Sequence, residues 1–184
     1  MEVQSIKSKI EGLEAVEYGI RCDLGVCKDL YHGTTKNIAY QIIKSGRIEC
    51  GNTSSYLGCG IYCYLHDINA CKIWVKNKYK NEPVTVFKLI ANLGNVLFVD
   101  TELYKFLRET LRKIGKTSGS DINDDIGILI EEIIEDYIIT EYEKDIHAVS
   151  RAYIIGKSTI RRPAIMYCLR YENRIKKFNI EPEV

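Results

Sequence analysis

The 184-residue sequence has little proline, one tryptophan and almost no net charge. Its three prolines exclude a long proline-rich linker, and its formal charge of +1 argues against binding nucleic acid or an anionic membrane by bulk charge alone. Its apolar runs are far shorter than the ~20 residues that a membrane-spanning helix needs, so we expect no contact with a membrane. A local charged patch remains compatible with this composition.

The seven cysteines are odd in number and lack the regular spacing of a small disulfide scaffold. The opening residues MEVQSIKSKIEGLE also lack the apolar core of a secretory signal. We therefore expect a reduced, cytoplasmic protein. With 46% hydrophobic and 28% charged residues, the chain has the composition of a single globular domain over residues 1–184.

Charge is divided along the chain. Residues 120–145 hold ten acids and one lysine, whereas residues 151–177 hold eight basic residues and one glutamate. The acids of the first segment alternate with apolar residues at helical spacing, which predicts an amphipathic helix over 124–140. The second segment contains a basic loop at 156–163, between two expected strands.

The spacing of hydrophobic residues, the helix-capping residues and the helix-breaking residues together predict a series of strands and helices. These elements do not repeat as strand–helix–strand units, which indicates an α+β fold. The expected elements are a strand at 30–32, a helix ending at Gly46, a strand at 60–64, a helix from 67, strands at 84–93 and 95–99, a helix from 100, the 124–140 helix, and strands at 147–155 and 164–170. We interpret 84–93 and 95–99, split by Gly94, as a strand pair.

Helix faces and caps follow from the same pattern. Thr34 or Thr35 is expected to cap the first helix, and Asp67 and either Asp100 or Thr101 the next two. The first helix should bury its apolar residues on one face, and the third should do the same; these residues are Ile38, Ile42, Ile43, Leu103, Phe106, Leu107, Leu111 and Ile114.

Three motifs suggest ligand sites and fail on spacing. Gly115-Lys116-Thr117 ends like a phosphate-binding loop but lacks the glycine five residues earlier. The acids from Asp121 onward match a calcium loop except at its turn glycine, where Ile126 stands. Cys59, Cys63 and His66 match no closed zinc site. We therefore expect no metal.

Two segments, Leu30-Tyr31-His32-Gly33-Thr34 and Leu57-Gly58-Cys59-Gly60-Ile61-Tyr62, each precede a helix, and a late strand contains Met166-Tyr167-Cys168-Leu169-Arg170. Together they resemble the diphtheria-toxin and poly(ADP-ribose) polymerase branch of the ADP-ribosyltransferase superfamily, over a core of residues 30–177. The resemblance implies an α+β fold with a split mixed or antiparallel sheet and flanking helices. It also implies NAD+ as the substrate, with no metal.

The resemblance assigns roles to particular residues. Gly33, with Thr34 beside it, matches the backbone that holds the nicotinamide carboxamide, and His32 matches the histidine that contacts the adenosine ribose. Tyr62 matches the tyrosine that stacks on the nicotinamide ring, with Tyr64 on the same side of its strand. An aromatic side chain on the following helix covers the other face of the ring in the family, and this sequence offers Trp74.

The third family position differs here. Met166 stands where polymerising members carry a catalytic glutamate, so the resemblance implies single-unit transfer or lost activity. The basic loop with Lys157, Arg161 and Arg162 stands where the family places its acceptor-recognition loop. We therefore expect a mono-ADP-ribosyltransferase that cleaves the nicotinamide–ribose bond and modifies a protein or a nucleic acid.

Other interpretations stay open. The chain is alternatively a catalytically impaired module that binds NAD+ or ADP-ribose, or an RNA 2′-phosphotransferase-like enzyme. A second transferase branch, with an arginine, a Ser-Thr-Ser run and a Glu-x-Glu pair, is matched only loosely by Arg21, Thr53-Ser54-Ser55 and Glu141-Tyr142-Glu143. A cytoplasmic NAD+-consuming transferase would suit a toxin or a defence effector with an inhibitor or antitoxin partner.

Overall fold

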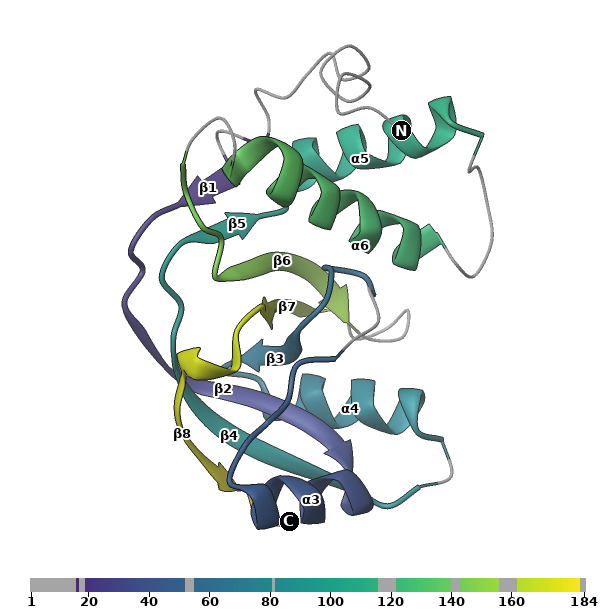
Figure 1. Ribbon diagram of the computed structural model, residues 1–184. Coiled ribbons are helices and arrows are strands. Elements are labelled where there is room, and N and C mark those ends of the chain that lie inside the picture. Colours follow the sequence, from purple (N-terminus) through teal and green to yellow (C-terminus); the bar gives the residue numbers. More distant parts are fainter. Residues whose placement is uncertain are drawn as a thin grey trace.

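The computed structural model describes residues 16, 19–51, 55–80, 82–115, 122–139, 143–155 and 162–182. The chain is a mixed α+β protein with one eight-stranded sheet and flanking helices (Figure 1). Its elements are β1 (Ile20–Arg21), β2 (Val26–Thr35), α3 (Lys36–Ser45), β3 (Ile61–Leu65), α4 (Ile68–Lys78), β4 (Val84–Asn92), β5 (Val96–Phe98), α5 (Thr101–Lys113), α6 (Ile122–Ile133), the π-helical η1 (Ile134–Ile138), β6 (Ala148–Ile155), β7 (Arg162–Leu169), the 3-10 turn η2 (Glu172–Arg174) and β8 (Ile175–Ile180).

The caps of the helices confirm the expected boundaries. Thr35 accepts a hydrogen bond from the Ile38 amide at 3.3 Å, and Asp67 and Asp100 each accept one at 2.8 Å from the amide three residues on. Each bond satisfies one amide that the first turn of a helix leaves without a partner. Gly46 ends α3 with a φ of 68°, a left-handed conformation that favours glycine.

The strands lie in the order β1-β5-β6-β7-β3-β2-β4-β8. Their pairings are antiparallel except for β5 with β6, which is parallel. The interpretation of 84–93 and 95–99 as a strand pair is therefore wrong. The open edge of β4 is taken by β8, which the sequence pattern did not predict, and β5 joins β1 and β6 on the other side of the sheet.

The two faces of the sheet bury different clusters. Helices α4, α5 and α6 cover one face, where Tyr64, Met166 and Cys168 belong to the same buried cluster as the helix residues. Helix α3 covers the other face with Ala39 and Ile42 (Figure 1). Helices α5 and α6 pack against each other and lie over the end of the sheet formed by β5 and β6 (Figure 1).

Some expected core residues are exposed. In α3, Ile42 is buried, but Ile38 and Ile43 are 41% and 52% exposed, because this helix covers the sheet along a narrow stripe. In α5, Leu103, Leu107 and Leu111 are buried as expected, whereas Ile114 follows the last helical residue and is 58% exposed. The sequence pattern therefore assigned more residues to the buried faces of these two helices than the structure buries.

Candidate functional site

The candidate site lies where β2 and β3 separate in the middle of the sheet. Their pairing covers Leu30 with Leu65 and Tyr31 with Tyr64, and stops there. The pairing of β2 with β4, in contrast, continues to Thr35. Beyond Tyr31 the edge of β2 that faces β3 is therefore released from the sheet ladder.

The alternation of hydrogen bonds along β2 shows which way the N–H and C=O of Gly33 point. Gly33 is paired with Val86, whose carbonyl accepts a bond from the Glu181 amide at 2.9 Å on the opposite edge of β4. The Lys36 amide donates to the Pro83 carbonyl, three residues further along the same pairing. In an antiparallel ladder the bonded edge alternates with each residue, so the N–H and C=O of Gly33 face β3.

His32 occupies the point where the two strands separate. Its Nδ1 lies 2.9 Å from the Tyr62 carbonyl oxygen, and the carbonyl can only accept, so Nδ1 carries the proton. The neutral ring then presents Nε2 as an acceptor. Burial lowers the pKa of His32, and the nearby Lys78 lowers it further, although the bond to Tyr62 opposes both. The ring is therefore neutral near pH 7.

The ring of Tyr62 is held from its hydroxyl end by the loop before β3. The hydroxyl donates to the Gly58 carbonyl at 2.8 Å and accepts from the Leu57 amide at 2.9 Å. Burial raises the pKa of Tyr62, so the phenol stays neutral. These two bonds fix the ring plane without using its faces.

Trp74 on α4 lies parallel to this ring. The planes of Tyr62 and Trp74 differ by 10°, and their centroids are 6.3 Å apart. A third ring in contact with both needs planes roughly 7 Å apart, since carbon atoms pack at about 3.5 Å. Helix α4 also packs closely on Gly33, where an added Cβ would lie 2.9 Å from Val75 Cβ. Binding a flat ligand here therefore requires a small outward movement of α4.

The other site residues that the sequence predicts are more deeply buried. Met166 is 3% exposed and faces Tyr64 across the β3–β7 pairing, and Tyr64 is 1% exposed with its hydroxyl bonded to that of Tyr153. Thr34 is buried as well. The side chains of these three residues therefore present almost no surface to a ligand in this structure.

The predicted acceptor loop falls largely outside the described residues. Lys157 and Arg161 lie there, and of Arg162 only the backbone position at the start of β7 is described. For the loosely matched second branch, Arg21 lies in the edge strand β1, five places from β2 in the sheet. This separation argues against grouping Arg21 with the β2–β3 site.

A buried ion pair supports the loop that holds Tyr62, and sequence reasoning missed it. Glu131 of α6 pairs with Arg170, which follows β7, and its Oε1 accepts from the Cys59 amide at 2.6 Å. Both side chains are mostly buried, at 18% and 11% exposure. The acidic pattern of α6 gave no signal for this role, since Glu131 stands among acids that face solvent.

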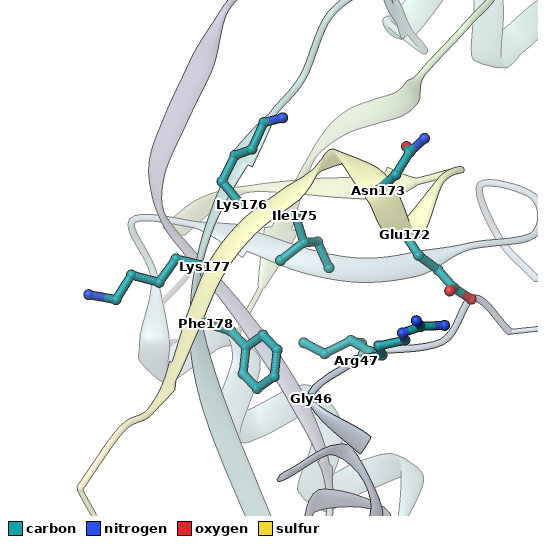
Figure 2. Close-up of a pocket in the computed structure, with 9 residues that line it drawn as sticks. Gly46, Arg47, Glu172, Asn173, Ile175, Lys176, Lys177 and Phe178 are labelled. Carbon is teal, nitrogen blue, oxygen red and sulfur yellow. The ribbon is translucent and has the colours of Figure 1, made fainter. Parts of the chain in front are cut away.

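Two cavities of the described residues lie away from this site. One of about 380 Å³ opens on the α3 side of the sheet, beside Arg47, Ile175 and Phe178 (Figure 2). Lys176 and Lys177 also belong to its lining, and Figure 2 shows their ammonium groups pointing away from Ile175 and Phe178. A second cavity, of about 530 Å³, lies between α3, α4 and β4. The β2–β3 site lines neither.

A third cavity, of about 400 Å³, adjoins the Glu131–Arg170 pair and is rimmed by Glu132 and Glu135. In the described part of the chain, no group of three or more histidine, cysteine, aspartate or glutamate side chains is arranged to hold a metal ion. Likewise, none of the helices described has both the length and the apolarity required to cross a membrane.

Two histidines make the stability of the fold depend on pH. Burial lowers the pKa of His147, whose Nδ1 accepts from the Asn95 amide at 2.9 Å, and burial lowers that of His32. Unfolded histidine titrates near pH 6.5, so below about that pH the unfolded chain binds more protons than the folded one. Stability is therefore expected to fall as the pH drops from about 7.5 to about 5.5.

Urea unfolding followed by circular dichroism measures this dependence. The double variant His32→Gln/His147→Gln should flatten the slope of stability against pH in this range, since neither site then titrates. His66→Gln serves as the control, because the His66 side chain is 64% exposed. An unchanged slope in the double variant would contradict the assignment of the effect to these two rings.

Comparison of the chain with family models, with curated proteins and with solved structures finds no match. The geometry of the β2–β3 site and the motif resemblance are therefore the only indications of function.

Proposed function

We propose that the protein is a mono-ADP-ribosyltransferase with an ADP-ribosyltransferase-like split sheet, which cleaves the nicotinamide–ribose bond of NAD+. One observation carries the proposal: the N–H and C=O of Gly33 turn into the gap between β2 and β3, where His32 and Tyr62 meet. A primary carboxamide presents one donor and one acceptor side by side, as a free strand edge does. Nicotinamide has such a group on a flat ring.

In this proposal the ring of nicotinamide enters between Tyr62 and Trp74. A pyridinium is attracted to the faces of aromatic rings, by about 0.5 to 2 kcal/mol per contact. The near-parallel planes of the two side chains suit one flat cation between them. The bonds from the Tyr62 hydroxyl to Leu57 and Gly58 keep that ring in place when α4 moves outward.

His32 binds the sugar rather than transferring a proton. Its Nδ1 proton is committed to the Tyr62 carbonyl, which leaves Nε2 to accept from a ribose hydroxyl. Because burial lowers its pKa, the ring stays neutral and does not repel the positive charge that develops at the ribose. The histidine thus fixes the dinucleotide in one orientation.

The reaction needs orientation more than acid–base chemistry. The bond between the ribose carbon and the ring nitrogen breaks, its electron pair stays with nicotinamide, and the pyridinium leaves as a neutral molecule. An acceptor nucleophile forms the new bond to the ribose carbon. Holding the two reactants together supplies most of the rate acceleration. Met166 contributes no charge to this step, which favours transfer of one unit over chain growth.

A catalytically impaired NAD+-binding or ADP-ribose-binding module is the second candidate. The observation that favours it is the burial of Met166 at the position of the family glutamate, because a buried thioether stabilises neither a ribose hydroxyl nor a developing cation. Saturable NAD+ binding without nicotinamide release would support this candidate.

Incubation of the full chain with NAD+ labelled in its adenylate phosphate, and with protein and nucleic-acid fractions, tests the proposal. We expect label on a macromolecule and free nicotinamide in equal amounts. His32→Ala and Tyr62→Ala should each lower the rate at least about 100-fold, since misplacement of a reacting group by about 1 Å already costs that much.

Tyr40→Ala is the matched control for loss of an aromatic ring, because Tyr40 is 68% exposed on α3, on the other face of the sheet. Circular dichroism establishes that each variant is folded. Nicotinamide release that persists in His32→Ala and Tyr62→Ala would overturn the assignment of the site. Transfer of an RNA 2′-phosphate to NAD+ would establish the phosphotransferase interpretation instead.

A further inference from the structure

Arg151 on β6 lies between two aromatic rings on the same sheet face as the candidate site. Its guanidinium carbon is 3.2 Å from the centroid of the Tyr104 ring and 5.2 Å from that of Tyr56, and its Nη1 donates to the Tyr56 hydroxyl. Stacking of this kind holds an arginine in one orientation, and the hydrogen bonds to Tyr56 and Tyr104 use only part of the five donors of its planar guanidinium. Arg151 is thus a positioned cation.

The place of Arg151 relative to the site follows from the strand register. Arg151 pairs with Met166 of β7, and Met166 pairs with Tyr64 of β3. The three side chains form one row across the sheet, about 10 Å from β6 to β3 at the usual strand spacing. Tyr56 adds a second connection, since it precedes Leu57, whose amide bonds to Tyr62.

In the part of the chain that the structure describes, no carboxylate lies within ion-pair distance of Arg151. Arg170 shows the contrast: it is also largely buried, and Glu131 neutralises it. A half-buried cation without a counter-charge is unfavourable unless an anion binds beside it. The cradle of aromatic rings therefore suits an anionic ligand.

The row itself contains no group that can remove a proton from an acceptor, and the carboxylate that acts on its Tyr64, Asp67, caps α4. Met166 has a thioether, and Tyr64 and Tyr153 hold each other by their hydroxyls. An alcohol or thiol acceptor must lose a proton to become a good nucleophile. A phosphate monoester is already a dianion for much of the time near pH 7, with a second pKa near 6, and needs no base.

We propose that Arg151 binds the acceptor, and that the acceptor is the terminal phosphate monoester of a nucleic-acid strand. This inference rests on the proposed function. A phosphate oxygen attacks the ribose carbon of NAD+, the carbon–nitrogen bond breaks, and nicotinamide leaves with that electron pair. The product is a phosphodiester, so the phosphate loses one negative charge and NAD+ loses the positive charge of its pyridinium. No proton has to move.

Charge along the chain favours a polyanion over a phosphorylated peptide. Arg151 opens a basic stretch of the chain, in which Lys157, Arg161 and Arg162 follow it within eleven residues. A nucleic-acid strand brings one charge per nucleotide besides its terminal phosphate, and lysines and arginines bind those charges. The forked guanidinium binds a phosphate through two parallel hydrogen bonds.

The test compares one unlabelled oligonucleotide in two forms, with a 5′-phosphate and with a 5′-hydroxyl, each incubated with the full chain and with NAD+ labelled in its adenylate phosphate. We expect label on the phosphorylated form alone. In Arg151→Gln, the ratio of transfer to nicotinamide release should fall about 10- to 100-fold, as for loss of hydrogen bonds to a charged group. Arg151→Lys should recover part of this ratio through its charge.

Arg108→Gln is the matched control, since Arg108 lies 5.9 Å from the same Tyr104 ring but on α5. A wild-type protein that labels both forms equally, or that labels only peptides, would overturn the proposal, as would a raised KM for NAD+ in Arg151→Gln with unchanged acceptor preference. If no condition releases nicotinamide, the proposed function fails. Fluorescence anisotropy then still tests the anion site, because binding should favour the 5′-phosphate and depend on Arg151.

Discussion

Replacing Glu131 by alanine is expected to lower the free energy of unfolding by about 3 to 5 kcal/mol, because it leaves the buried charge of Arg170 without its carboxylate. The change also removes the acceptor of the Cys59 amide. That amide lies in the turn whose Gly58 carbonyl binds the Tyr62 hydroxyl. The variant should therefore weaken both the fold and the position of the stacking ring.

Chemical unfolding of the wild type, Glu131→Ala, Glu131→Leu, Arg170→Met and the double variant Glu131→Leu/Arg170→Met measures this pair. The double variant should be more stable than either single one, because it leaves no unpaired charge in the interior. Glu132→Ala is the control, since Glu132 is the adjacent, exposed carboxylate of the same helix. Equal losses in Glu131→Ala and Glu132→Ala would refute the role of the ion pair.

The helices were predictable because their signals are local. Thr35, Asp67 and Asp100 cap helices where the sequence places them, and Gly46 ends one. A cap depends on a side chain and an amide three residues away, so neighbouring letters suffice to identify it. The buried residues of α5, Leu103, Leu107 and Leu111, were predictable because they recur every four positions along the sequence.

Strand partners were less predictable, because pairing is a relation between distant segments. The prediction that 84–93 pairs with 95–99 applied the preference of adjacent strands for one another. It failed because β8 takes the edge of β4, and nothing in the short sequence of β8 marks that partner. The parallel pairing of β5 with β6, across two helices, is equally absent from local pattern.

The candidate site was likewise predictable only in part. The adjacency of His32 and Gly33 and the strand of Tyr62 were visible in the sequence, and the structure brings them together through the 2.9 Å contact of His32 Nδ1 with the Tyr62 carbonyl. The cradle of Arg151 was not visible in the sequence, because Tyr56 and Tyr104 precede it by 95 and 47 positions and belong to separate segments. Long-range packing alone produces that arrangement.

Replacing Gly60 by alanine is expected to destabilise the protein by more than about 3 kcal/mol, because two costs coincide at this position. Its φ of 154° is a conformation that residues with a side chain rarely adopt. In addition, an alanine Cβ would lie 2.7 Å from Cys168 Sγ and closer still to the Leu169 carbonyl oxygen. That oxygen belongs to the backbone of β7, so it cannot turn away as a flexible side chain can.

Gly46→Ala separates these two costs. Gly46 also has a positive φ, 68°, but an added Cβ there meets nothing within 4 Å, so it should cost only about 1 to 2 kcal/mol. The difference between the two variants in urea unfolding then measures the contact with β7. Because Gly60 precedes β3 by one residue, Gly60→Ala should also shift Tyr62 and slow the proposed cleavage of NAD+, whereas Gly46→Ala should not. Equal stability of the two variants would show that β3 and β7 separate freely at this point, and the rigid support proposed for Tyr62 would be lost.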